Sequence, residues 1–239
     1  MSGSAITVGL IHATAAAMEP SYLALTEGFP EADAWHILDD RLARDADAAG
    51  GVMLPSLRRR MLALIGYLVD GGAQGVLLTC SMYSPVVELA TSLWDVPVVS
   101  SDEEMFAEVA RQSPARIVVI GSLESAVASS LARLHAAVAA DPRTSWQMQA
   151  TGIVAPGAAA ADEAGDRAGL FASLRDAACT SPKLFDMILI AQYSLTPVQA
   201  ELERMLGIPV LSPPTLATRA LRRRVLGETN LPSLGGART

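Results

Sequence analysis

The sequence contains an internal repeat. Residues 75–100, GVLLTCSMYSPVVELATSLWDVPVVS, align without a gap on residues 187–212, MILIAQYSLTPVQAELERMLGIPVLS, at a constant offset of 112. The identical positions are, in the first copy, Leu77, Pro85, Val86, Pro97, Val98 and Ser100. Each copy is typical of an apolar strand, a polar turn, a helix that begins near a proline, and a second strand that follows a proline. The repeat therefore predicts an α/β unit that is used twice.

Strand and helix patterns alternate along the rest of the chain. Short apolar runs bounded by turn residues predict strands at Ile6–Ile11, Ala34–Leu38, Gly75–Thr79, Val96–Ser100, Arg116–Ile120, Trp146–Ile153, Met187–Ala191 and Ile208–Leu211. Longer stretches with 3.6-residue spacing predict helices at Leu54–Gly71, Val86–Leu93, Asp102–Gln112, Leu123–Ala140, Ala161–Cys179, Thr196–Leu206 and Thr215–Val225. We predict an α/β fold with two pseudo-symmetric lobes, each a mainly parallel four-stranded sheet flanked by helices, and an active site in the cleft between the lobes.

The lobe boundary is expected near Ser100. The final strand and the last helix are predicted to return to the first lobe, which gives residues 1–100 plus 210–239 for the first lobe and 101–209 for the second. The segment Ala13–Tyr22, rich in Ala and containing a Pro, is expected to be a loop at the edge of the cleft. The tail Asn230–Thr239 is rich in Gly, Ser and Pro, and we expect it to be frayed.

Composition and the absence of several motifs exclude some function classes. A formal net charge of −7 opposes non-specific binding to nucleic acid, and no apolar run approaches the roughly 18 residues that would cross a bilayer. Two distant cysteines without a signal-peptide pattern favour a reducing, cytoplasmic location and free thiols. The chain has neither a phosphate-binding Gly-rich loop nor a GxSxG elbow, and its three scattered histidines argue against a metal site. We expect a small diffusible ligand as partner.

The polar turn of the first copy carries a cysteine. Cys80 lies between a predicted strand and a predicted helix, with Thr79, Ser81 and Ser84 around it. Backbone N–H groups and the helix dipole at such a position lower a thiol pKa from about 8.5 toward neutrality. We therefore expect Cys80 to act as a base, an acid or a nucleophile, whereas Cys179, at the end of an Ala-rich helix, is expected to be structural.

These residues resemble the aspartate/glutamate racemase superfamily, which includes glutamate, aspartate and hydantoin racemases, maleate isomerase and arylmalonate decarboxylase. The resemblance spans nearly the whole chain and rests on the strand Ile6–Ile11 and the segments VLLTCS, IVVIGS, MILIAQ, VPVVS and IPVLS. It implies a cofactor-independent active site between two lobes, where two cysteines commonly move a proton on and off carbon. Cys80 matches the first of these. A homodimer is common in that family, and the sequence neither requires nor excludes one.

The second cysteine of the pattern would fall at Gln192, where this sequence departs from it. An amide has no pKa suited to proton transfer, but it can donate a hydrogen bond to a carboxylate or to a developing enolate oxygen. The leading hypothesis is a racemase or isomerase that acts on a small carboxylate substrate through Cys80. The alternatives are a one-thiol decarboxylase or lyase, and a paralogue that binds a carboxylate without changing it.

Residues around the thiol are predicted to bind the substrate. The turn after Cys80 supplies hydroxyl and N–H donors, Gly121 and Ser122 match the small-residue turn that binds carboxylate in the family, and His12 ends the first strand. The full predicted set is Cys80 and Gln192 as catalytic residues and His12, Thr79, Ser81, Tyr83, Ser84, Gly121, Ser122, Tyr193 and Ser194 as binding residues. His36 and His135 are expected to be structural.

Overall fold

The protein contains two four-stranded parallel sheets with the same strand order. The computed structural model describes residues 5–141, 147–180 and 185–228. The first sheet has the order β2-β1-β3-β4 and the second has the order β6-β5-β7-β8. The strands are β1 Ile6–His12, β2 Ala32–Leu38, β3 Gly75–Leu78, β4 Val98–Val99, β5 Arg116–Gly121, β6 Gln149–Val154, β7 Met187–Ile190 and β8 Val210–Leu211. Every pairing between these strands is parallel, which confirms the predicted fold class.

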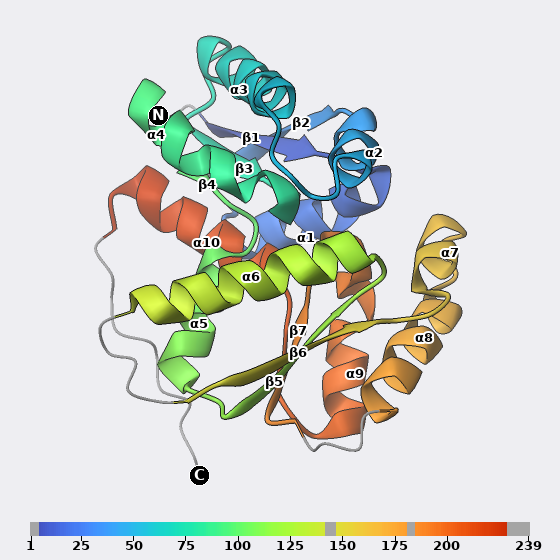
Figure 1. The fold of residues 1–239 in the computed structure, drawn as a ribbon. Coiled ribbons are helices and arrows are strands. Elements are labelled where there is room, and N and C mark those ends of the chain that lie inside the picture. Colours follow the sequence, from blue (N-terminus) through green and yellow to red (C-terminus); the bar gives the residue numbers. More distant parts are fainter. Residues whose placement is uncertain (1–4, 142–146, 181–184, 229–239) are drawn as a thin grey trace.

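Helices cover both faces of each sheet (Figure 1). They are α1 Met18–Gly28, α2 Arg41–Ala48, α3 Pro55–Asp70, α4 Val87–Leu93, α5 Glu103–Gln112, α6 Glu124–Ala140, α7 Ala158–Glu163, α8 Arg167–Cys179, α9 Gln199–Leu206 and α10 Pro213–Leu226. Short 3-10 helices are η1 Ala15–Ala17, η2 Ser81–Val86 and η3 Tyr193–Val198. Helices α6 and α10 run between the two sheets, where α6 packs on η2 and α10 packs on both β3 and η3.

The repeat is reproduced in three dimensions at its offset of 112. Strand β3 corresponds to β7, η2 to η3, α4 to α9, and β4 to β8. Pro85 and Pro197 lie inside η2 and η3, so in both copies the chain leaves a buried strand through a 3-10 turn before the α-helix begins. This arrangement places Cys80 and Gln192 at the same point of the two copies.

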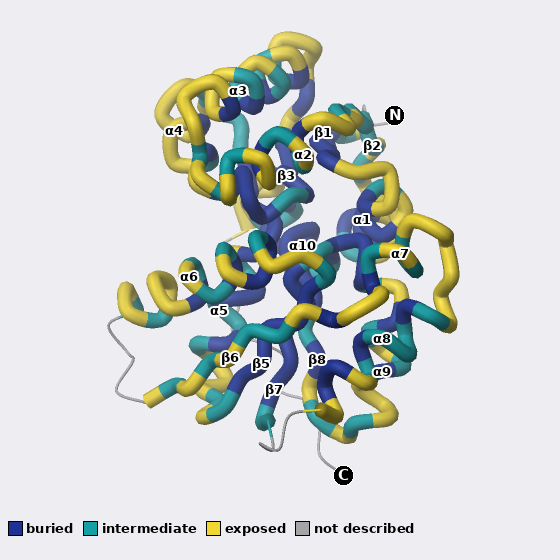
Figure 2. The backbone as a smooth tube through the Cα atoms, turned by 45° about the vertical axis from the view of Figure 1, so that its right-hand side comes forward, coloured by how far each residue is buried: buried dark blue, intermediate teal, exposed yellow. Residues whose placement is uncertain are grey.

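The central strands are more buried than the edge strands β2 and β6. All residues of β3 and β7 are buried, whereas the edge strands β2 and β6 are only partly covered, as Figure 2 shows. Burial on both faces explains why the central strands appear in the sequence as continuous apolar runs rather than as alternating patterns. Gly75 allows α10 to approach, because a Cβ there would lie 2.6 Å from a methyl carbon of Val225.

One predicted strand assignment is wrong. The final strand was expected in the first lobe, but β8 pairs with β7 in the second sheet, with Ile188 opposite Val210. The repeat itself requires this pairing, because β4 pairs with β3 in the same way. The last helix, α10, packs Ala217, Ala220 and Leu221 against the first sheet. The division of the chain into lobes at residues 100 and 210 otherwise remains a prediction.

Three helical segments also differ from the prediction. The segment Ala13–Tyr22, expected to be a loop, contains η1 and the start of α1, since Ala has a high helix propensity. The predicted helix Ala161–Cys179 is divided into α7 and α8, because Gly165 adopts a positive φ of 65° and the Asp166 side chain caps α8 at the N–H of Gly169. Helix α2 was not predicted. The other predicted helices occur close to their expected bounds. Trp146 and the tail Asn230–Thr239 lie outside the described residues.

Candidate active site

The turns that follow β3 and β7 line one small cavity. We call this space of about 100 Å³ the thiol cavity. Its polar lining from the first half of the chain is Thr14, Thr79, Cys80 and Ser81. Its polar lining from the second half is Asp162, Gln192, Tyr193 and Ser194. The carboxyl ends of parallel strands open toward this cavity, as expected for a site in an α/β fold.

The electrostatic setting of Cys80 differs from the prediction. Burial, together with a smaller contribution from the nearby Asp102 carboxylate, raises the pKa of the thiol to about 11. Backbone N–H groups of Met82 and Tyr83, and the Arg133 guanidinium, favour the thiolate but do not outweigh burial. The expected lowering toward neutrality is therefore wrong for the free protein: Cys80 carries its proton at neutral pH. Desolvation prevails because Cys80 packs against the hydrophobic core of the first half and α6 packs on the turn that follows it.

A buried ion pair holds the turn that carries Cys80. Arg133, from α6, contacts the Asp102 carboxylate with N···O distances of 2.5 and 2.8 Å and also donates to the backbone carbonyl of Ser81 at 2.8 Å. Ser84 donates its hydroxyl to the same carboxylate at 3.1 Å. The Asp102 side chain is 1% exposed, and burial raises its pKa, although Arg133 opposes that shift. Arg133 therefore connects the second half of the chain to the thiol turn of the first half.

Gln192 is held in a fixed orientation by Ser122. Its Oε1 accepts from the Ser122 N–H at 2.7 Å and from the Ser122 hydroxyl at 3.1 Å. Gly121 makes this approach possible, because a Cβ at Gly121 would lie 3.0 Å from Oε1 and 2.8 Å from Val127 Cγ2. With Oε1 occupied in this way, the amide group at Nε2 is the part of Gln192 that can donate to a ligand.

His12 lies behind the cavity rather than in its lining. The side chain is fully buried, with Nδ1 at 3.1 Å from the Thr79 hydroxyl oxygen and Nε2 at 2.9 Å from Nδ1 of His36. Thr79 in turn donates to the Ile11 carbonyl. Burial, and secondarily the neighbouring His36, lowers the pKa of His12 to about 4, so His12 is neutral at physiological pH. His12 therefore supports Thr79, which lines the cavity.

The structure gathers part of the predicted set. Residues lining the thiol cavity are Cys80, Gln192, Thr79, Ser81, Tyr193 and Ser194. Gly121 and Ser122 lie one layer away, against Gln192. Tyr83 and Ser84 direct their hydroxyls elsewhere, since Tyr83 donates to the Leu42 carbonyl at 2.9 Å and Ser84 binds Asp102. Cys179 is exposed at the end of α8 and is not part of the cavity lining.

Sequence reasoning missed Asp162. This residue lies in α7 and lines the thiol cavity together with Cys80 and Gln192. Burial raises the pKa of Asp162 and the adjacent Glu163 adds to this, whereas a hydrogen bond from the Ser194 hydroxyl opposes it. A signal was present in the sequence: Gly165 followed by Asp166 is typical of a helix end followed by a new N-cap. Recognising that break would have placed Asp162 near the end of a short helix.

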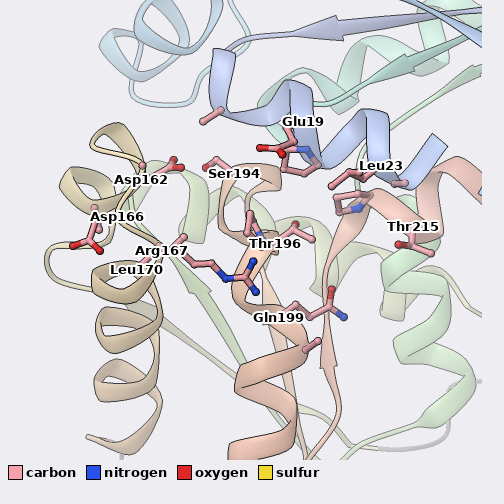
Figure 3. A pocket seen from close by; sticks show the side chains of 18 of the residues that line it. Glu19, Leu23, Asp162, Asp166, Arg167, Leu170, Ser194, Thr196, Gln199 and Thr215 are labelled. Carbon is pink, nitrogen blue, oxygen red and sulfur yellow. The ribbon is translucent and has the colours of Figure 1, made fainter. Parts of the chain in front are cut away.

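A larger groove adjoins the thiol cavity. It has a volume of about 650 Å³ and lies between α1, the α7–α8 region and the segment from η3 to α9. Figure 3 shows the Asp162 side chain directed toward Ser194 at one side of this groove, with Glu19 nearby on α1. Asp162 and Ser194 line both spaces. The groove and the thiol cavity are therefore neighbours that share these two side chains.

Two kinds of site are absent from the described residues. Within residues 5–141, 147–180 and 185–228, no group of three or more His, Cys, Asp or Glu side chains is arranged to hold a metal ion. In the same part of the chain, none of the helices combines the length and apolar character required to span a membrane.

Comparisons with known proteins concern the family and the fold of the chain. A family model described as Asp/Glu/Hydantoin racemase matches residues 2–221. No curated protein matches the sequence. The fold is similar to glutamate racemase from Thermus thermophilus in complex with β-chloro-D-alanine, with a TM-score of 0.71, 18% identity, and coverage of 94% of this chain and 82% of that chain.

Two other solved structures have similar folds. Picrophilus torridus aspartate racemase gives a TM-score of 0.70 and 12% identity over 92% of this chain and 93% of that chain. The Gly74Cys mutant of arylmalonate decarboxylase, in a sulfate-associated form, gives a TM-score of 0.65 and 17% identity over 95% and 97%. At these identities the structural likeness demonstrates a shared fold.

Proposed function

Because the chain belongs to the Asp/Glu/hydantoin racemase family, we propose that it is a cofactor-independent racemase or isomerase that moves a proton at carbon in a small carboxylate substrate through Cys80. The observation that carries the proposal is the single cavity lined by Cys80 from one repeat and by Gln192 from the other. The similar glutamate racemases were crystallised with small amino-acid ligands, β-chloro-D-alanine and D-glutamate, which supports a substrate of this size.

The thiol acts as a proton donor in the resting state. A pKa of about 11 keeps Cys80 protonated at neutral pH, so its proton is available to a carbanion or enolate that forms next to it. Negative charge then develops on the oxygens of the substrate carboxylate. Gln192 Nε2 and the Ser81 hydroxyl line the cavity and can donate to those oxygens. The hydroxyls of Thr79 and Ser194 already donate, to the Ile11 carbonyl and to Asp162 respectively.

A second candidate function is decarboxylation. Gln192 cannot take or give a proton, and the protonated Cys80 suits an enolate that forms by loss of carbon dioxide and then takes one proton on one face. Arylmalonate decarboxylase has a similar fold, so the scaffold accommodates this chemistry. An isomerase in which Cys80 adds to a carbon–carbon double bond also requires only one thiol, and in that case the sulfur must first lose its proton.

Proton NMR in deuterated water tests the proposal. Wild type, Cys80→Ala and a Cys179→Ala control are incubated with D- and L-aspartate and glutamate, hydantoins, substituted malonates and maleate. We expect exchange at the α-carbon with formation of the opposite enantiomer in the wild type. The rate of racemisation should fall on the order of 10² to 10⁴-fold in Cys80→Ala and should not fall in Cys179→Ala.

The other outcomes are distinguishable. Loss of a carboxylate with deuterium on one face identifies the decarboxylase and contradicts the racemase assignment. Binding of panel members without any chemical change supports a carboxylate-binding paralogue. Racemisation at the wild-type rate in Cys80→Ala removes the thiol from the mechanism.

A further inference from the structure

Asp162 is an ionisable group of the thiol cavity that the function proposed above does not use. Among the described residues that line the cavity, the ionisable side chains are Cys80, Asp162 and Tyr193. Burial, together with the charge of Asp102, raises the pKa of Tyr193 well above its usual range, so Tyr193 remains neutral. Cys80 and Asp162 are therefore the two groups available for proton transfer near neutral pH.

The two groups come from different halves of the molecule. Cys80 follows β3 of the first sheet, whereas Asp162 lies on α7, which packs on η3 and α8 in the second half. Gln192 directly precedes η3, so Asp162 lies on the same side of the cavity as the position where the family pattern has its second cysteine. The Ser194 hydroxyl bonds to Asp162 and fixes its carboxylate at the border between cavity and groove (Figure 3).

We propose that Asp162 is the second proton carrier of the site, opposite Cys80, and that it supplies the acid–base function that Gln192 lacks. This inference rests on the proposed function and deepens it, because it makes two-sided proton transfer possible with a single thiol. Partial burial supports the assignment, since it favours the protonated acid more than bulk water does. Gln192 then serves as a hydrogen-bond donor between the two carriers.

Each turnover requires one group that takes a proton and one group that gives a proton, and Asp162 and Cys80 supply one each. In the resting state Asp162 is a carboxylate and Cys80 is a thiol. The Asp162 carboxylate takes the α-proton from one face of the substrate, the C–H electron pair is delocalised into the substrate carboxylate, and the Cys80 thiol donates its proton to the other face. The protein then holds a carboxylic acid and a thiolate, which process the opposite enantiomer directly or return to the resting state by proton exchange with water.

The experiment compares Asp162→Asn and Asp162→Glu with wild type, Cys80→Ala and the control Asp166→Asn. Asp166 lines the groove but not the thiol cavity, and Asn preserves the cap that Asp166 makes on α8. Deuterium exchange at the α-carbon is followed by proton NMR, separately for the D- and L-enantiomers of aspartate, glutamate and 5-substituted hydantoins. Thermal unfolding of each variant establishes that it is folded.

We expect complementary losses in the two variants. Asp162→Asn abolishes exchange of one enantiomer and lowers racemisation on the order of 10² to 10⁴-fold, whereas Cys80→Ala abolishes exchange of the other enantiomer. Asp162→Glu restores part of the lost exchange, and Asp166→Asn leaves both rates unchanged.

Several results overturn the inference. Racemisation at the wild-type rate in folded Asp162→Asn overturns it while leaving Cys80 in place, and so does an equal loss for both enantiomers. Decarboxylation that places deuterium on one face of the product, at a rate that Asp162→Asn does not change, also overturns the inference. A wild-type protein that shows no Cys80-dependent exchange contradicts the proposed function itself.

Discussion

The two copies of the repeated unit share a backbone course but differ in the polar groups beneath their turns. In the first copy, Ser84 binds the buried Asp102, which is paired with Arg133. In the second copy, Thr196 occupies the position of Ser84, and its buried hydroxyl has no hydrogen-bond partner within the described residues. Pro214 lies at the same offset from Asp102 and lines the groove. The turn of the first copy is therefore fixed by a buried ion pair, whereas the turn of the second copy adjoins the groove.

The ends of the first strands differ in the same way. Strand register makes His12 the counterpart of Gly121 in the two sheets. His12 supports Thr79 in the first half, whereas Gly121 leaves room for Gln192 in the second half. The repeated unit therefore provides two equivalent positions, and the residue at each position, a thiol at Cys80 and an amide at Gln192, decides which one can carry a proton. The side chains behind each position support that residue.

Breaking the ion pair of the first copy has the largest expected effect. Arg133→Met leaves the Asp102 carboxylate buried without a counter-charge, so we expect the free energy of unfolding to fall by about 3 to 5 kcal/mol. Urea unfolding at pH 7 measures this. Arg175→Met is the control, because the Arg175–Asp176 pair is 41% and 69% exposed and its loss costs less than about 1 kcal/mol. Similar small losses in both variants would show that the pair does not fix the thiol turn.

The buried His12 makes the first half sensitive to acid. Its pKa is about 4 in the folded state and about 6.5 when unfolded, so the unfolded chain binds more protons between these values. The stability due to neutral His12 is present above pH 6.5 and is lost as the pH falls through 4, a change of about 3 kcal/mol.

His12→Asn tests this acid sensitivity through urea unfolding between pH 7 and 4. We expect a flatter pH dependence in this variant than in the wild type. His135→Gln, at an exposed position on α6, should retain the wild-type dependence. A His12→Asn curve parallel to that of the wild type contradicts the prediction.

The matched hydroxyls of the two copies give the smallest expected effect and the sharpest comparison. Ser84→Ala removes a hydrogen bond to a buried carboxylate and should cost about 1.5 to 3 kcal/mol. Thr196→Val removes a buried hydroxyl that lacks a described partner, and the change should lie within about 0.5 kcal/mol of zero or be stabilising. Both changes are measured from the urea concentration at the midpoint of unfolding. The variants must keep the wild-type dependence of the unfolding free energy on urea concentration. Equal costs at the two positions would mean that Thr196 has a bonding partner in solution.

Much of the fold could be predicted because local patterns agree with it. The gapless repeat predicts two equivalent units, and the apolar runs at Gly75–Leu78 and Met187–Ile190 predict strands that are buried on both faces. The assignment of the final strand failed although the repeat contained the answer, since β8 must pair with β7 as β4 pairs with β3. The break at Gly165 was missed because helical spacing continues across it.

The sequence by itself determined that Cys80 and Gln192 occupy equivalent positions after two parallel strands, because strand direction and repeat offset are local properties of the chain. Only the tertiary structure decided that the thiol remains protonated, that Arg133 joins Asp102 beneath it, and that Asp162 reaches the same cavity. A pKa depends on how much water and charge surround a group, and these surroundings come from segments that are distant along the chain. Cys80 is therefore recognisable from its neighbours in sequence, whereas its chemistry is set by its neighbours in space.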